Sequence, residues 1–212
     1  MGDAAVSRLI GVLGRRSRQR RMTMFIDTLK PGQETRILDV GGTVAFWTTA
    51  GVVAPIVVLN PALWAAGDGP ENVSFIQGDG TATGYHDHEF DIVFSNSVIE
   101  HLGTIEQQRR MACEIRRVGR AYWVQTPARW FPFDGHLIAP FVHWLPRRWH
   151  RYLAPITPYA LLSRATVSQT RATVDEIRFL SSTEMRRLFP DAVLRRETVF
   201  WLTKSFVAVK HA

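Results

Sequence analysis

Residues 36–43 are RILDVGGT, a short apolar run that contains one acid and ends in two glycines before a threonine. The apolar run predicts a buried strand, and Gly41 and Gly42 predict a tight turn directly after it. Glycines in such a turn let a ligand come close to the backbone. Asp39 stands just before the turn, and a carboxylate there suits a cationic ligand better than a pyrophosphate. We therefore expect a strand, a ligand-binding turn and a short helix at this point.

Similar apolar runs follow along the chain, and helical patterns or turns separate them. Strands that are apolar throughout, rather than alternating with polar residues, are typical of a parallel sheet with helices on both faces. The pattern predicts an α/β fold with a mostly parallel, seven-stranded, Rossmann-like sheet. The six further strands are expected at residues 56–59, 73–76, 91–94, 121–125, 192–200 and 205–210.

Three helices are marked by the spacing of their residues. Apolar residues three and four apart predict an amphipathic helix over residues 22–29. Thr104 and Ser181 each stand three residues before a glutamine or glutamate, which is the spacing of a capping box at a helix start. Cys113, the only cysteine, is expected in the core of the helix that follows Thr104. A single cysteine excludes a disulfide within the chain.

Residues 127–172 interrupt the regular pattern. They hold six of the eleven prolines, three of the seven tryptophans and three of the seven histidines. This composition predicts an inserted cap after the fifth strand rather than further sheet. We expect one domain over residues 1–212, in which this cap binds the acceptor and residues 1–30 form a basic helical arm.

The net charge of +7 is unevenly distributed. Residues 1–36 hold eight lysines and arginines against three acids, and residues 127–172 hold six arginines against one acid. Each segment thus carries +5, so the remainder of the chain carries −3. Basic patches attract phosphates, nucleic acid or acidic lipid, although solvated arginine faces also serve solubility alone.

The sequence also bears on location and partners. No apolar run is long enough to span a bilayer, and Asp3 and Arg8 interrupt the apolar stretch that a signal peptide would need. We expect a cytoplasmic protein and leave open a peripheral contact with a membrane surface. A nucleic-acid partner is disfavoured because no separate nucleic-acid-binding module is evident. Whether the chain forms an oligomer stays open.

Polar side chains end three successive predicted strands. Asp39 ends the first strand, Asn60 ends the second 21 residues later, and Asp79 ends the third. Asn60 could hydrogen-bond ribose hydroxyls, and Asp79 could accept a hydrogen bond from an adenine amino group. The carboxyl ends of parallel strands meet at one edge of the sheet, so these side chains are predicted to line one crevice.

Five segments resemble those of the class I methyltransferases that use S-adenosylmethionine: RILDVGGT (36–43), VVLN (57–60), IQGDGT (76–81), FDIVFSNSVIEHL (90–102) and YWVQTP (122–127). The resemblance covers roughly residues 25–127. FDIVFSNSVIEHL, together with WFPFDGH in the cap, is similar to a bacterial subgroup of small methyltransferases that resemble sugar O-methyltransferases. The resemblance implies a methyltransferase fold and a cofactor site formed by Asp39, Gly41, Gly42, Thr43, Asn60, Asp79, Gly80, Ser95 and Asn96.

The sequence departs from the family pattern at three positions. Thr43 and Ala45 stand where the family has glycines, and Asn60 stands where it has an acid. The missing glycines and the missing acid are each compatible with cofactor binding, but a carboxylate is not available at position 60 to recognise the ribose.

Methyl transfer to a hydroxyl needs a base to take the proton. His136 lies in the segment expected to cover the methyl group and is the first candidate, with Asp134 to orient its imidazole or to hold a metal. His101 and Glu100, after the fourth strand, are the second choice. Each histidine could instead be a packing or surface residue. The resemblance to sugar methyltransferases also makes Mg²⁺ a candidate cofactor.

The aromatic residues of the cap have two interpretations. They could stack on sugar rings, or they could pack in a core. The residues concerned are Trp130, Phe131, Phe133, Trp144 and Trp149.

Three hypotheses for the function follow. The first is O-methylation of a saccharide hydroxyl, for which the resemblance suggests a mannoside of polymethylated polysaccharides. The second is methylation of a lipid-like or polyketide small molecule. The third is a non-catalytic, RNA-associated protein that binds through residues 15–21. The residues SNSV after the fourth strand differ from the Pro-Pro-aromatic turn of amino-group DNA methyltransferases.

Overall fold

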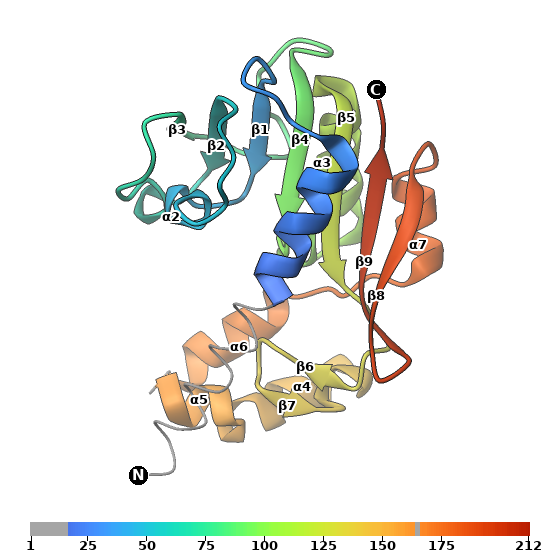
Figure 1. Ribbon diagram of the computed structural model, residues 1–212. Coiled ribbons are helices and arrows are strands. Elements are labelled where there is room, and N and C mark those ends of the chain that lie inside the picture. Colours follow the sequence, from blue (N-terminus) through green and yellow to red (C-terminus); the bar gives the residue numbers. More distant parts are fainter. Residues whose placement is uncertain (1–16, 164–165) are drawn as a thin grey trace.

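The computed structural model describes residues 17–163 and 166–212, and a seven-stranded sheet forms its centre (Figure 1). The strand order is β3-β2-β1-β4-β5-β9-β8, in which β1 to β5 run parallel and β9 is antiparallel to both of its neighbours. The prediction of a mostly parallel seven-stranded sheet is confirmed. The strands are β1 (Ile37–Val40), β2 (Ile56–Asn60), β3 (Val73–Gln77), β4 (Phe90–Asn96), β5 (Gly119–Pro127), β8 (Val193–Val199) and β9 (Leu202–Lys210).

Helices cover both faces of the sheet, because alternate residues of each strand point to opposite sides. The helix of residues 17–29 and the short α2 (Val44–Trp47) pack on one face (Figure 1). α3 (Ile105–Val118) and α7 (Ser182–Leu188) pack on the other. Two short 3₁₀ helices, η1 (Leu63–Ala65) and η2 (Ile99–Leu102), follow β2 and β4.

The helix of residues 17–29 is anchored on the sheet by one aromatic side chain. Phe25 is fully buried, and its ring meets the rings of Phe94 at 4.9 Å, Trp123 at 5.9 Å and Trp47 at 6.4 Å, each edge to face. Such aromatic contacts add to the free energy gained from burial itself. The predicted amphipathic helix over residues 22–29 is therefore present and buries its apolar face.

α3 begins and ends as its capping residues predict. Thr104 accepts a hydrogen bond from the backbone of Gln107, and Gly119 follows the last residue of the helix. The expectation that Cys113 lies in the core is wrong, because it sits on the exposed side of this helix. The side that faces the sheet is instead formed by Gln108, Met111, Ala112, Ile115 and Val118.

The inserted cap is also confirmed, and it lies beyond the carboxyl ends of β4 and β5 (Figure 1). It has a small apolar core of its own, to which Leu137, Ala139, Ala154 and Val174 contribute. Its elements are β6 (Phe133–Asp134), β7 (Ala139–Pro140), η3 (Val142–Trp144), α4 (Arg147–Leu153), η4 (Ala154–Ile156), α5 (Pro158–Ser163) and α6 (Val167–Glu176).

The basic arm predicted for residues 1–30 can be followed only in part. Residues 1–16, including Arg15 and Arg16, lie outside the described residues. The boundaries at residues 30, 127 and 172 stay predictions. Within residues 17–163 and 166–212, no helix is long and apolar enough to cross a bilayer.

We expect Phe25→Ala to lower the free energy of unfolding by about 3–5 kcal/mol, because it removes a buried aromatic ring and leaves a cavity. The exposed Thr23 lies on the same helix, and Thr23→Ala should change stability by less than about 0.5 kcal/mol. Urea denaturation of both variants measures the difference. A loss below about 1 kcal/mol for Phe25→Ala would contradict the packing of this ring against the sheet.

Candidate functional site

The turn after β1 is packed so closely that two glycines are needed. Gly41 has a φ of +80°, and a Cβ added there would lie 2.3 Å from a methyl group of Val98. A Cβ added at Gly42 would lie 1.8 Å from Oδ2 of Asp39. Neither position can hold a larger residue without displacing its neighbours.

Asn60 holds this turn in place from the end of β2. Its Nδ2 donates to the carbonyl oxygens of Gly41 at 3.0 Å and Gly42 at 2.8 Å. Its Oδ1 accepts from the backbone of Ala62 at 2.9 Å. Both amide hydrogens are thus used within the protein, so Asn60 positions the turn. Its contact with a ribose stays a prediction.

Asp39 presents an unusual carboxylate beside the turn. The side chain is buried, and its Oδ2 accepts a 2.7 Å hydrogen bond from the indole of Trp47. Its Oδ1 has no hydrogen-bond partner among the described residues. Burial raises the pKa of Asp39 to about 7, although the bond from Trp47 lowers it in part. A cationic group beside Oδ1 would stabilise the ionised form.

A pocket of about 340 Å³ opens in front of Asp39, between the start of the helix of residues 17–29 and the carboxyl end of the sheet. One carboxylate and several cations line it, a combination that suits an amino acid zwitterion. The lining residues include Arg18, Arg21, Asp39, Gly41, Gly42, Thr43, Asn96 and Lys204.

Arg21 is a lining residue that the sequence did not assign to the cofactor site. It is 11% exposed and contacts Glu197 through Nε at 3.1 Å. Its Nη1 donates to Asn96 Oδ1 at 2.9 Å and Gln125 Oε1 at 3.0 Å. These partners come from β8, β4 and β5, between 75 and 176 residues away in sequence. No local pattern could have identified this network.

Two other predicted cofactor residues have structural contacts. Ser95 is fully buried, and its hydroxyl donates to the carbonyl of Val40 at 3.0 Å. Gly80 packs against β1, since a Cβ there would lie 2.4 Å from a methyl group of Val40. Both residues shape the edge of the sheet. Their direct contacts with a cofactor stay predictions.

Asp79 lies in a second pocket, of about 310 Å³, on the same edge of the sheet. Its Oδ1 accepts hydrogen bonds from the backbone and the hydroxyl of Thr81, at 2.8 and 2.9 Å. His101 and Gln107 line the same pocket. The carboxylate is exposed and therefore accessible to a ligand, as the adenine hypothesis requires.

The four candidate catalytic residues lie together where η2 meets the cap. The Nδ1 of His136 is 3.3 Å from Oδ1 of Asp134, and the rings of His136 and His101 are 4.8 Å apart. Glu100 is buried, and its Oε2 accepts a 2.9 Å hydrogen bond from Thr126. Its Oε1 has no partner among the described residues. Both candidate pairs from the sequence thus form one cluster.

The carboxylates of Asp134 and Glu100 favour the protonated, positively charged form of His136. Burial lowers the pKa of His136, but the neighbouring carboxylates of Asp134 and Glu100 outweigh burial and raise the pKa above its usual value. Burial raises the pKa of Glu100, against the favourable charge of His136. An imidazole flanked by carboxylates is suited to accept a proton and to hold it.

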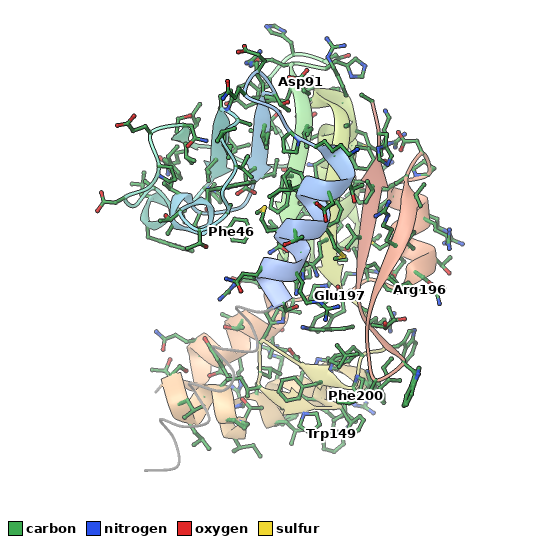
Figure 2. The ribbon with its side chains drawn as sticks, in the orientation of Figure 1. Phe46, Asp91, Trp149, Arg196, Glu197 and Phe200 are labelled. Atoms are coloured by element: carbon green, nitrogen blue, oxygen red, sulfur yellow. The ribbon has the colours of Figure 1, made fainter. Side chains whose placement is uncertain are left out.

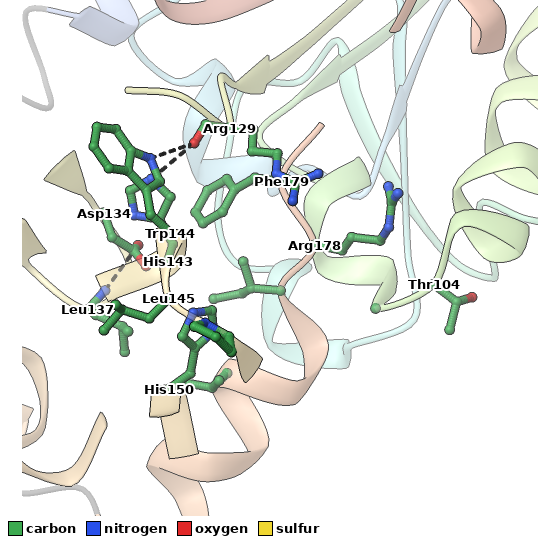
Figure 3. Close-up of a pocket in the computed structure, with 14 residues that line it drawn as sticks. Thr104, Arg129, Asp134, Leu137, His143, Trp144, Leu145, His150, Arg178 and Phe179 are labelled. Atoms are coloured by element: carbon green, nitrogen blue, oxygen red, sulfur yellow. Dashed lines mark hydrogen bonds between the residues drawn. The ribbon is translucent and has the colours of Figure 1, made fainter. Parts of the chain in front are cut away.

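A cavity of about 700 Å³ adjoins this cluster, and Figure 3 shows its lining. Asp134 forms part of its wall, together with side chains of the cap and of the segment after α6. His143 Nε2 and Trp144 Nε1 both contact the carbonyl of Arg129, at 3.1 and 3.0 Å (Figure 3). The cavity thus combines aromatic, apolar and charged groups, among them Arg129, Trp144, Leu145, His150, Arg178 and Phe179.

Core packing does not account for most of the aromatic residues of the cap. Four of them are between 43% and 63% exposed: Trp130, Phe133, Trp144 and Trp149. Stacking of these rings on a sugar stays a prediction.

One side-chain group within the described ranges has the composition of a metal site. The ligand atoms of Glu100, His101 and His136 lie within 4.8 Å of one another, and Asp134 is not part of this group. Mg²⁺ prefers oxygen ligands in octahedral geometry, and two imidazoles do not supply them. These residues therefore do not fit Mg²⁺, and no step of the chemistry is assigned to it.

Comparisons with known proteins place this geometry in context. A family model described as a methyltransferase domain matches residues 57–121, from β2 into β5. No protein of curated function shows a significant sequence match. The YcgJ protein of Bacillus subtilis has a similar structure, with 15% identity and a TM-score of 0.53 over 84% of this chain and 70% of that one.

Two further solved structures show the same fold. A provisionally named O-methyltransferase of Nostoc punctiforme has 13% identity and a TM-score of 0.58, over 92% of this chain and 56% of that one. A provisionally named methyltransferase from an antibiotic biosynthesis pathway of Anabaena variabilis has 15% identity and a TM-score of 0.54, over 85% and 66%. Such identities establish the fold alone. The family match and the fold together support a methyltransferase.

We expect Asp39→Asn to raise the free energy of unfolding above that of wild type, and to do so by more at pH 8 than at pH 5. The pKa of Asp39 is raised from 3.8 to about 7 in the folded protein. Its ionisation therefore lowers the free energy of unfolding of the wild type progressively as the pH rises through that range. The variant carries no such cost, so its advantage should grow by a few kcal/mol between the two pH values. Urea denaturation of both proteins at both pH values measures this advantage. If the variant and wild type differ in stability by the same amount at pH 5 and pH 8, the raised pKa of Asp39 is refuted.

Proposed function

We propose that the chain is an S-adenosylmethionine-dependent methyltransferase that methylates a hydroxyl of a saccharide, with His136 as the general base. The observation that carries the proposal is the buried, unpartnered Oδ1 of Asp39, a residue that lines a pocket together with several cations. A ligand with both an ammonium and a carboxylate matches this arrangement.

The residues at the edge of the sheet fit the parts of the cofactor. Asp39 would hold the ammonium of the methionyl part, and Arg21 or Lys204 its carboxylate. Asp79 would accept a hydrogen bond from the adenine amino group. The bound cofactor would supply a methyl group already activated by a sulfonium. The protein then has to align the acceptor and exclude water.

The His136 cluster supplies the remaining requirement, a base for a weakly acidic hydroxyl. Nδ1 of His136 lies 3.3 Å from Oδ1 of Asp134, without the geometry of a hydrogen bond. In this proposal Asp134 orients the ring from that side, and Nε2 takes the proton. The hydroxyl proton of the acceptor would pass to this nitrogen as the acceptor oxygen takes the methyl group. The carboxylates of Asp134 and Glu100 stabilise the imidazolium that results.

The cavity beside this cluster is the proposed acceptor site. Trp144 and Phe179 offer aromatic faces, and Arg129 and His143 offer polar groups. Sugars bind through this combination of stacking and hydrogen bonds. A mannoside of a polymethylated polysaccharide is the specific acceptor that the sequence resemblance favours. The apolar part of the wall, which includes Leu137, Leu145, Val174 and Ile177, favours a lipid-like small molecule as the second candidate.

His136→Ala should reduce methyl transfer by about 10²-fold or more and leave the affinity for S-adenosylmethionine within about twofold, because only the base is lost. Transfer from labelled cofactor to a panel of saccharides, some partly methylated, measures turnover with and without Mg²⁺. Calorimetry measures affinity. His86→Ala, exposed and remote from the cluster, is the matched control. Full activity of His136→Ala would exclude this residue as the base.

Asp79→Ala should weaken cofactor binding by about 1–3 kcal/mol, because an adenine amino group would lose its acceptor. Thr81→Val removes one hydrogen bond to Asp79 but keeps its carboxylate, and should have a smaller effect. Isothermal titration calorimetry compares the two variants. If wild-type protein at high concentration gives no heat with S-adenosylmethionine, the proposed function itself fails.

A further inference from the structure

The hairpin between β8 and β9 ends in two aromatic residues that point into solvent. Val199 pairs with Leu202, so Phe200 and Trp201 form a two-residue turn. Phe200 is 85% exposed and Trp201 is 96% exposed. Their φ angles are 46° and 65°, the pattern of a type I′ turn.

This turn is unfavourable for folding in two ways. Type I′ turns favour Asn-Gly, because bulky side chains rarely adopt positive φ. Large aromatic side chains are also unfavourable in water. Two aromatic residues at the tip therefore stabilise neither the turn nor a core. Residues in strained backbone conformations and exposed apolar side chains are both frequent at binding sites for ligands, partners or membranes.

Further exposed aromatic side chains come from the cap, which the hairpin adjoins. The backbone of Ala128 donates to the carbonyl of Lys204 at 2.9 Å, so the chain that leaves β5 runs along β9. The ring of Trp144 is 6.2 Å from that of Trp130 and 5.1 Å from that of Phe141. Trp149 and Phe200 lie at the same, cap end of the molecule in Figure 2. We call Trp130, Phe141, Trp144, Trp149, Phe200 and Trp201 the aromatic face; each is at least 43% exposed.

The charge around the aromatic face is positive. Residues 17–26, 127–172 and 193–205 contain only two acids, Asp134 and Glu197. The exposed acids Asp27, Asp175 and Glu176 lie near the C-terminal ends of the helix of residues 17–29 and of α6. The side chain of Asp134 is 3% exposed, and that of Glu197 is 15% exposed and paired with Arg21. The start of the N-terminal helix adjoins the hairpin, since Ser17 bonds to Glu197 at 2.9 Å and to Lys204 at 2.9 Å. Exposed arginines in these segments include Arg18, Arg20, Arg129 and Arg148.

We propose that the aromatic face docks on a bilayer that contains anionic lipid, with Phe200 and Trp201 inserted at its interface. Tryptophan and phenylalanine partition to the boundary between headgroups and acyl chains. Arginines around them contact the lipid phosphates, and each basic residue near such a surface adds to the attraction. A projecting tip of two residues enters a fluid bilayer without needing a complementary groove.

A second copy of the chain fits this face less well. Two copies joined through it would bring the same positive surfaces together, with no exposed acid in these segments to pair with them. Like charges in such a contact repel. A lipid surface instead supplies negative charge opposite these exposed arginines.

Docking would also orient the larger cavity. Trp144 and Leu145, 43% and 41% exposed, belong both to the cavity wall and to this end of the protein. An acceptor attached to a membrane lipid would then reach the cavity from the bilayer. This consequence rests on the proposed function, whereas membrane binding itself does not.

Flotation of the full chain with vesicles tests the proposal. Vesicles of 70% phosphatidylcholine and 30% phosphatidylglycerol should bind the protein at least about tenfold more tightly than vesicles of phosphatidylcholine alone. Raising the salt concentration should weaken this preference. Phe200→Asn/Trp201→Gly gives the turn its preferred sequence while removing the tip, so it should keep or raise the melting temperature and reduce binding about tenfold or more.

Trp64→Ala is the matched control, because it removes an exposed tryptophan far from the hairpin. Trp64 is 77% exposed in η1, after β2, at the opposite edge of the sheet from β8 and β9, and this variant should bind vesicles as wild type does. Equal binding by the Phe200→Asn/Trp201→Gly variant, or no binding by wild type, would overturn the proposal. So would a wild-type dimer that this variant converts to a monomer, or salt-dependent RNA binding without vesicle binding. Calorimetry with S-adenosylmethionine tests the proposed function independently.

Discussion

The burial of the Asp39 carboxylate at the end of β1 is the constraint on which the proposed cofactor pocket depends. Its Oδ2 is held by Trp47, while its Oδ1 has no partner among the described residues. Such a group weakens the folded state when it ionises, so the surrounding structure has to hold it in place. The tight turn of Gly41 and Gly42 leaves room for it, and the amide of Asn60 fixes that turn. A cationic ligand would turn this cost into binding free energy.

The second constraint is the attachment of the cap to η2. The backbone of Arg178 donates to the carbonyl of Glu100 at 2.7 Å, and that of Gly103 donates to Glu176 at 2.9 Å. The side chain of Gln108 bonds to the carbonyls of Ile99 and Arg178 and so connects both segments to α3. These contacts hold the end of the cap beside the residues that follow β4. His136 is thereby placed next to Glu100 and His101, although it lies about 35 residues later in the chain.

Described residues of both basic segments lie toward the cap end of the fold (Figure 1), and their arginines have different surroundings. Arg21 is almost buried and ties the N-terminal helix to β4, β5 and β8 through three side chains. Arg21 is paired with Glu197 and also lines the pocket in front of Asp39, so it holds the wall of that pocket in place. The exposed arginines beside the hairpin include Arg18, Arg20, Arg129 and Arg148. The acids of the surrounding segments, Asp134 and Glu197, are largely buried. The high net charge is therefore partly structural and partly a feature of one surface.

The sequence by itself determined the sheet, because burial on both faces requires apolar runs and the turns between them require glycine. It placed all seven strands and the inserted cap, and it proposed Asp39 and the glycine turn as part of the site from adjacent residues. It misplaced Cys113, which follows the buried Ala112 but points to the exposed side of α3. Only the tertiary structure decided the rest: the Arg21 network, the use of Asn60 and Ser95 to hold β1, and the meeting of His136 with Glu100. These contacts join residues far apart in sequence, and their geometry depends on how the elements pack rather than on any local pattern.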